Sequence, residues 1–151
     1  MTTVTLTRTL SGLSPGDGHA KRYLSRIPIG SPVTAAIVQP RSAEGRRLFR
    51  RYWVLMGIVA DNCEQYGGSQ EAASDHALIH AGHCDMFASQ ATGEVFLRPR
   101  SIAFSNLEEE DFAVLWQRVV RAICEHILPG VTEAAIEEEL LSLIGAMGGR
   151  K

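Results

Sequence analysis

The spacing of apolar side chains at the start of the chain predicts short strands around one short helix. Residues 3–10 (TVTLTRTL) alternate apolar and polar side chains, a period of two that is typical of a strand. Residues 33–39 (VTAAIVQ) are rich in β-branched side chains and predict a second strand, which Pro40 closes. Between them we expect a loop over 11–18 and a short helix over 19–27.

Farther along the chain the apolar period changes to that of helices. A long helix is predicted from Ser42, its N-cap, to about Tyr66, where Gly67 and Gly68 stop it. A second helix is predicted over 69–82 with Ser69 as its cap. Two strands, 85–89 and 94–104, are expected to pair across the turn at 90–93.

Two more helices are predicted in the last third of the chain. Asn106 and Glu109 have the spacing of a capping box at the start of a helix that ends before Pro129. Thr132 is expected to cap a last helix over 133–147. The pattern as a whole predicts an α+β fold over residues 1–151, a single helix-dominated domain with a small antiparallel sheet.

Composition narrows the class of protein. A chain of 151 residues with 45% hydrophobic and 21% charged residues is typical of a globular domain. No apolar run has the length of a membrane span, and the first residues lack the apolar core of a signal peptide. Three widely spaced cysteines without a CxxC pair indicate buried thiols, so we expect a protein of the cytoplasm.

Positive charge is concentrated in the first part of the chain. Residues 1–58 hold nine basic and two acidic side chains, although the formal net charge of the whole chain is −2. The stretch RSAEGRRLFRRYW (41–53) alone holds five arginines and three aromatic residues. Arginine offers a planar fork that matches phosphate and stacks on aromatic rings, so this segregation points to a polyanionic partner.

On a helical projection the long helix has two different faces. Tyr52, Leu55, Met56, Val59 and Cys63 form the core stripe. Four arginines are expected on the opposite, outward face, with Trp53 on the boundary; they are Arg46, Arg47, Arg50 and Arg51. A solvated helix face is the simpler interpretation. The functional interpretation is phosphate contacts from arginine with base stacking on Trp53, which suits single-stranded nucleic acid.

A histidine cluster offers a rival chemistry. His76, His80 and His83 have the spacing of one helical face, and Asp85 follows closely. These four residues would be the candidates for a metal-dependent nuclease. Gly82 is expected to end the helix before His83, and no second carboxylate cluster accompanies the histidines. Histidines with a structural role are the favoured interpretation, and no cofactor or catalytic residue is expected.

Three stretches resemble a known group of phage proteins. RRYWVLMG (50–57) and RPRSIAFSNLEEEDFAVLW (98–116) resemble the NinB/Orf recombination proteins of lambdoid phages and a related, uncharacterised phage and prophage family. AGHCD (81–85) resembles the uncharacterised branch in particular. The resemblance spans most of the chain, although seven residues separate Ser42 from Arg50 here and the polar Gln/Asn pair expected between them is missing.

The resemblance implies an intertwined α+β homodimer without enzymatic activity. It implies binding of single-stranded DNA, contact with the host single-stranded-DNA-binding protein, and help in loading a phage recombinase. By this resemblance, the arginine-aromatic motif of the family is Arg50, Arg51, Tyr52 and Trp53, and the exit of the strand pair is Arg98, Arg100 and Ser101. Of these, Arg50, Arg51, Trp53, Arg98 and Arg100 are expected to contact DNA.

The sequence therefore predicts a recombination accessory protein that binds single-stranded DNA in the cytoplasm of a bacterial host. Two alternatives stay open: the metal-dependent nuclease, and a protein-binding adaptor that uses the apolar stripe of its last helix.

Overall fold

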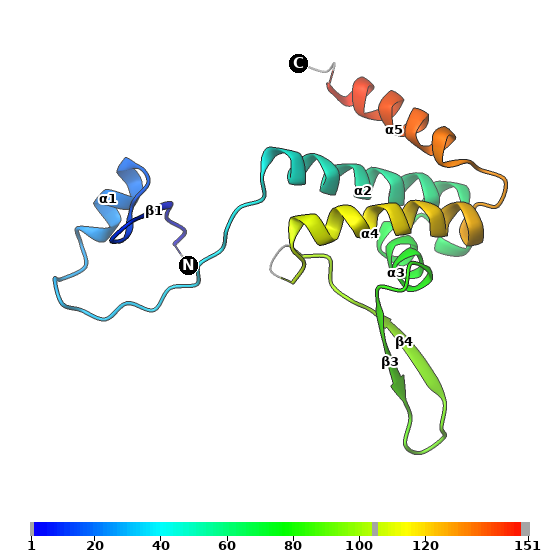
Figure 1. Ribbon diagram of the computed structural model, residues 1–151, viewed down its shortest axis with the longest axis horizontal. Helices are drawn as coiled ribbons and strands as arrows, with labels where there is room; N and C mark the ends of the chain where they lie inside the picture. The colour runs from blue at the N-terminus through cyan, green and yellow to red at the C-terminus, as the bar shows by residue number, and fades with distance from the viewer. Residues whose placement is uncertain (1, 104–105, 149–151) are drawn as a thin grey trace. The chain divides into compact units, whose positions relative to one another are not determined.

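The structure is a computed structural model that describes residues 2–103 and 106–148. The chain forms two compact units, Met1–Ile37 and Val38–Lys151; in Figure 1 the first is coloured from blue to cyan and the second from cyan to red. The single domain predicted over residues 1–151 stays a prediction.

The first unit is a small hairpin followed by one helix. Strand β1 (Leu6–Thr9) pairs antiparallel with strand β2 (Gly12–Pro15), and helix α1 spans Gly18–Leu24. Gly12 occupies a positive φ of 145° in the tight turn between the strands, which favours glycine. The strand predicted over 3–10 is present in shorter form. The loop predicted over 11–18 is wrong in its first half, because β2 lies there.

The second predicted strand, over 33–39, is also wrong. The segment is extended but forms no ladder with any residue that the structure describes, and Val33, Ile37 and Val38 are exposed. β-Branched side chains favour an extended backbone, but a strand also needs a partner, which a single stretch of sequence cannot supply.

The second unit is dominated by helices and has its own antiparallel strand pair, β3 with β4. This confirms the helix-dominated α+β class. Its elements, in chain order, are α2 (Ala43–Asn62), the 3-10 helix η1 (Glu64–Tyr66), α3 (Gln70–His80), β3 (Cys84–Ala88), β4 (Val95–Pro99), α4 (Glu109–Ala122), the π-helical turn η2 (Ile123–Ile127) and α5 (Glu133–Gly148).

The predicted stripe of the long helix forms the centre of the core. Tyr52, Leu55, Met56 and Val59 are all fully buried, whereas Cys63 lies half-buried at the end of α2. The Tyr52 hydroxyl and the Ser74 hydroxyl of α3 form a buried hydrogen bond of 2.5 Å. Burial raises the pKa of Tyr52 to about 12, so its hydroxyl stays protonated and ties α2 to α3.

The helix caps follow the sequence with one exception. The hydroxyls of Ser42, Ser69 and Thr132 each accept a hydrogen bond from a backbone N–H of the first turn, as predicted. The capping box of Asn106 with Glu109 is wrong. Glu108 is the N-cap of α4, and the Glu109 carboxylate accepts hydrogen bonds from the Ser42 hydroxyl and from the Ser42 N–H, the latter at 3.1 Å.

This cross-helix cap fixes the first turn of α2 against the first turn of α4. A Cβ atom added at Gly45 would meet the Glu109 side chain, so an alanine there would push the carboxylate away from Ser42. Hydrogen bonds from Ser42, and to a smaller extent the nearby Arg41 cation, hold the pKa of Glu109 below its usual value. The carboxylate is therefore charged at neutral pH.

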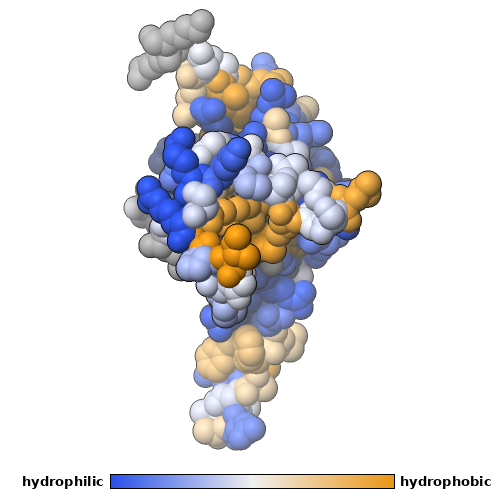
Figure 2. All heavy atoms as spheres, turned by 90° about the vertical axis from the view of Figure 1, so that its left-hand side faces the viewer, coloured by the Kyte–Doolittle hydropathy of each residue, from blue (hydrophilic) through white to orange (hydrophobic). Residues whose placement is uncertain are grey.

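The strand pair projects from the helices as a hairpin (Figure 1). Cys84 pairs with Pro99 at its base and Ala88 with Val95 near its tip. The strand predicted over 94–104 ends at Pro99; its last residue, Phe104, and the neighbouring Ser105 lie outside the described residues. Five large apolar side chains of the hairpin are exposed: Met86, Phe87, Val95, Phe96 and Leu97. Figure 2 shows pale orange, apolar side chains in the lower part of the view.

The last helix is packed at its start and exposed towards its end. Ile136 and Leu140 of α5 are buried in the core, but Leu141 and Met147 are exposed. The apolar stripe predicted for this helix therefore serves the core over its first half only. Among the described residues, no helix combines the length and the apolar character that crossing a membrane requires.

Candidate nucleic-acid interface

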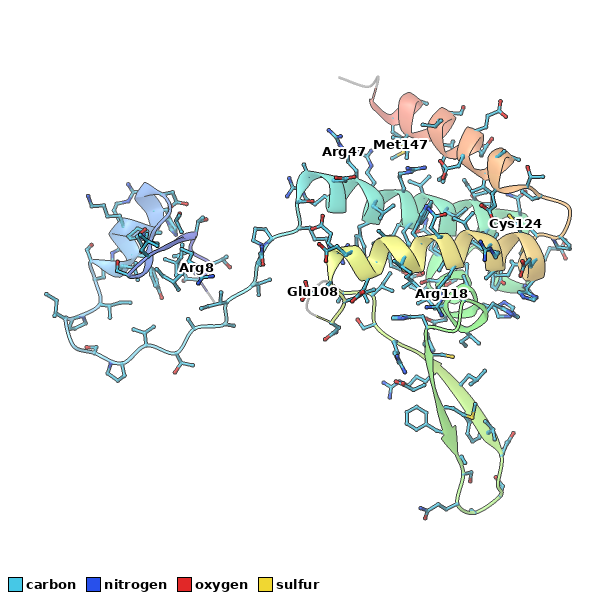
Figure 3. The ribbon with its side chains drawn as sticks, viewed as in Figure 1. Arg8, Arg47, Glu108, Arg118, Cys124 and Met147 are labelled. Atoms are coloured by element: carbon cyan, nitrogen blue, oxygen red, sulfur yellow. The ribbon has the colours of Figure 1, made fainter. Side chains whose placement is uncertain are left out.

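Three of the four arginines predicted to face outward do so. Arg46, Arg47 and Arg50 are exposed on α2, and none forms an ion pair with any residue in the described parts of the chain. Figure 3 shows Arg47 pointing away from α4 near the start of the helix. Arg46 donates a hydrogen bond of 2.5 Å to the Arg41 carbonyl. We call these three side chains the arginine face.

Arg51 does not belong to this face, and the expectation that it points outward is wrong. Its guanidinium pairs with the Glu137 carboxylate of α5 and lies 5.5 Å from the centre of the Trp116 ring. The side chain is 30% exposed. Helix α5 covers this side of α2, so Arg51 joins two helices of the fold instead of meeting a ligand.

Arg41, at the start of the arginine-rich stretch, also has a role within the fold. Its guanidinium stacks on the Phe49 ring at 3.8 Å from the ring centre and donates a hydrogen bond of 2.9 Å to the Ile102 carbonyl. Burial lowers the pKa of Arg41, and the nearby Glu109 carboxylate opposes this shift. These contacts hold the segment after β4 against α2.

Trp53 lies in a cavity of about 450 Å³ between α2, α3 and the end of β4. Its indole is half-buried and makes edge-on contacts with Phe49, at 6.3 Å between ring centres, and with Tyr52, at 5.4 Å. Arg98 and Arg100 line the same cavity. The structure thus brings together three predicted nucleic-acid-binding residues that lie far apart in the sequence: Trp53, Arg98 and Arg100. We call this hollow the Trp53 cavity.

Two carboxylates that no sequence motif singled out also line the Trp53 cavity. Glu71 and Asp75 lie four residues apart on α3, both exposed. Neither forms an ion pair with a residue that the structure describes. Their spacing places them on one face of a helix, which was the available signal, but nothing in the sequence indicated which element that face meets.

The arginines at the end of β4 line a second cavity on their other side. This cavity, of about 420 Å³, includes His83, Asp85 and Asn106. The Arg100 guanidinium forms an ion pair with Asp85, with 2.7 Å between Nε and Oδ1. His83 Nε2 lies 3.5 Å from the Ser101 carbonyl oxygen. Arg98 and Arg100 therefore separate two hollows at the base of the hairpin, and Arg98 forms no ion pair within the described residues.

The predicted histidine cluster is divided between two places. The ring nitrogens of His76 and His80 lie 2.9 Å apart, and the Tyr66 hydroxyl lies 2.5 Å from the other nitrogen of His76. His83 and Asp85 lie instead at the hairpin base. Within the described residues, no three or more histidine, cysteine or acidic side chains are arranged to hold a metal ion. The four candidates therefore do not form one metal site.

A histidine from another helix takes the third place in the cluster. The ring of His126 stacks on that of His80, with 4.8 Å between centres and 16° between planes. The π-helical turn η2 carries His126, and no sequence pattern predicted it. Burial, and then the nearby His76 and His126, lower the pKa of His80. The His80 ring is therefore neutral near neutral pH, and its stack with His126 joins α3 to the turn that follows α4.

Residues 57–144, more than half of the chain, match the model of the family described as protein of unknown function (DUF1367). The chain belongs to the DUF1367 family. No curated protein and no solved structure matches it.

The DUF1367 match divides the candidate residues. It includes Arg98, Arg100, both carboxylates of the Trp53 cavity and the histidines. It begins at Gly57, inside α2, so Trp53 and the arginine face lie before it. The DUF1367 match therefore covers the residues at the base of the hairpin but not the first turns of α2.

Proposed function

We propose that the protein binds single-stranded DNA and acts, without catalysis, as a recombination accessory protein related to the NinB/Orf group, in the cytoplasm of a bacterial host. The observation that carries the proposal is the Trp53 cavity. A half-exposed indole beside Arg98 and Arg100 combines a stacking surface with phosphate-binding side chains, which are the two elements of single-strand recognition.

The arginine face supplies the second part of the proposed mechanism. Arg50 precedes Trp53 by three residues, and residues at this spacing are neighbours on a helix surface. A strand whose phosphates meet Arg46 and Arg50 can therefore continue towards the indole. Arginines without carboxylate partners favour a polyanion, because like charges this close repel one another until an anion neutralises them.

The two alternatives receive unequal support. The structure adds no support to the nuclease hypothesis, because its four residues lie in two places and Asp85 is paired with Arg100. A protein contact has a specific observation in its favour: an isolated two-stranded hairpin is marginally stable in water, and this hairpin exposes apolar side chains on both faces. We propose that a second copy of the chain covers it, as the homodimer of the NinB/Orf resemblance implies; contacts with the host single-strand binder or a recombinase are part of the same proposal.

A titration of labelled single-stranded and duplex oligonucleotides at several salt concentrations tests the proposed function. Single strands should bind more tightly, and log K should fall linearly with log salt with a slope of about −0.7 for each phosphate contact. Binding that does not respond to salt would instead favour the adaptor. Light scattering at micromolar concentration tests the assembly: a monomer mass would contradict the homodimer.

A further inference from the structure

Phosphate capture alone does not account for the chemistry of the Trp53 cavity. Its walls hold as many carboxylates, Glu71 and Asp75, as arginines. A hollow that only gathered phosphates would bind more tightly without these acids, since like charges repel. Because neither carboxylate is paired with a cation in the described residues, both have acceptor oxygens available to a ligand.

The cavity has the size and the walls of a site for a flat heteroaromatic group. Its volume of about 450 Å³ lies within the range of about 300 to 1,000 Å³ for small-molecule sites. Phe49 and Tyr52 hold the Trp53 ring in a fixed orientation through their edge-on contacts. Leu78 and Ile102 add apolar wall, and the Ser74 hydroxyl is already engaged by Tyr52.

We infer that this cavity takes one unstacked nucleobase and selects it by its amino groups, with guanine preferred and thymine disfavoured. This inference rests on the proposed function. A carboxylate accepts two parallel hydrogen bonds, and guanine presents two adjacent N–H donors, from the ring nitrogen and the amino group, on its Watson–Crick edge. Thymine presents a single N–H between two carbonyl oxygens, which face a carboxylate unfavourably.

The two arginines and the two carboxylates then have different tasks. Arg98, which has no ion-pair partner among the described residues, meets the phosphate that flanks the base. Arg100 is held by Asp85 at 2.7 Å, which orients it at the border of the cavity. Glu71 and Asp75 read the base edge while Trp53 stacks on its face.

The test compares oligonucleotides that differ only in two central bases. Thymine strands of about 12 nucleotides carry two central guanines, cytosines, adenines or thymines, and fluorescence anisotropy gives each affinity. We expect the guanine strand to bind about 5- to 150-fold more tightly than the all-thymine strand, the range of one bidentate base contact. The other two strands should fall between them.

Variants assign the preference to the carboxylates. Glu71→Gln combined with Asp75→Asn keeps side-chain size, and should reduce the guanine preference to about twofold or less because the paired acceptors are gone. Glu64→Gln combined with Asp61→Asn makes the same chemical changes at exposed positions outside the cavity and should keep the preference. Arg98→Gln should weaken all four strands alike.

The outcomes distinguish failure of the base selection from failure of single-strand binding. Equal binding of the four strands overturns the base selection but leaves single-strand binding in place. A guanine preference that persists in the Glu71→Gln, Asp75→Asn variant also overturns base selection by these carboxylates. The two acids would then be candidates for contact with a cationic side chain of a partner protein. Absence of binding to every strand overturns the proposed function and the inference together.

Discussion

The arginine face of α2 and the Trp53 cavity are both candidate DNA contacts, but they differ in kind. The face consists of three exposed guanidiniums without carboxylate partners in the described residues, on a convex helix surface. The cavity is concave and holds both signs of charge around an oriented indole. Charge without shape attracts any strand, whereas shape with mixed charge can distinguish one base from another. If the proposed function holds, the arginine face would supply affinity and the Trp53 cavity would supply selectivity.

The largest effect is expected from removing the stacking surface. Trp53→Ala should weaken single-strand binding by about 5- to 150-fold, since a stacked base contributes about 1–3 kcal/mol, with little change in salt dependence. Titrations at several salt concentrations measure both quantities. Trp53→Phe is the control for folding, because the indole also packs on Phe49 and Tyr52. A folded Trp53→Ala protein with wild-type affinity would move the binding site away from the cavity.

The arginine face should show the opposite signature. Arg46→Ala combined with Arg50→Ala should flatten the slope of log K against log salt by about 1.4, which is two phosphate contacts on a single strand. The same replacement at Arg51, which is paired with Glu137, should reduce stability and leave the slope nearly unchanged. An unchanged slope in the double variant would mean that Arg46 and Arg50 make no phosphate contacts and that the arginine face is a solvated helix surface.

A third substitution alters the junction between the first turns of α2 and α4 and leaves the arginines of the arginine face unchanged. Gly45→Ala should destabilise the fold by about 1–3 kcal/mol, because the added Cβ meets the Glu109 carboxylate and the junction is already well packed. Denaturant unfolding followed by circular dichroism measures the change. Gly145→Ala is the matched control: that helical glycine has no neighbouring atom within 4 Å of an added Cβ. Equal stability of the two variants would contradict the tight junction.

The same junction predicts a dependence on acid. The pKa of Glu109 is lowered in the folded protein. The charged carboxylate therefore stabilises the fold at pH values above 4.5, its ordinary pKa, and this contribution is lost as the pH falls below 4.5 towards the lowered pKa of the folded state. Glu109→Gln should therefore remove part of the loss of stability between about pH 5 and pH 3. Unfolding curves at several pH values measure this. An acid response identical in the variant would mean that the junction does not depend on the charged form.

The smallest effect on DNA binding is expected from the histidines. His76→Gln combined with His80→Gln should change single-strand affinity by about threefold or less, as is usual for surface changes away from a site. The residues lie on the part of α3 that meets His126, and neither lines the Trp53 cavity. Collapse of binding, or loss of a nuclease activity in a folded variant, would return the cluster to the candidate site.

The sequence predicted local features well where one helix determines them. The core stripe of α2, the caps at Ser42, Ser69 and Thr132, and the outward placement of Arg46, Arg47 and Arg50 all depend on helical periodicity or on the first turn of a helix. The gathering of Trp53 with Arg98 and Arg100 had only a family resemblance behind it. Periodicity does not indicate which distant element meets a helix face.

The errors have the same physical origin. Helical periodicity predicts that Arg51 faces solvent, because α5, which covers it, lies far along the chain. The spacing of Asn106 and Glu109 predicts a cap within one helix, whereas the Ser42 hydroxyl is a cross-helix partner for Glu109. Residues 33–39 have the composition of a strand without a ladder partner in the described chain. The π-helical turn that carries His126 has no propensity signature at all.

The two tryptophans occupy contrasting environments, and this has an optical consequence. Trp116 is 4% exposed in the core beside Arg51, whereas Trp53 borders an open cavity. A soluble quencher such as iodide should reach only one of the two fluorophores. Anything that enters the Trp53 cavity should change that emission and leave the other as an internal reference. The protein thus carries its own reporter of occupancy, and a Trp116→Phe variant would isolate it without an attached dye.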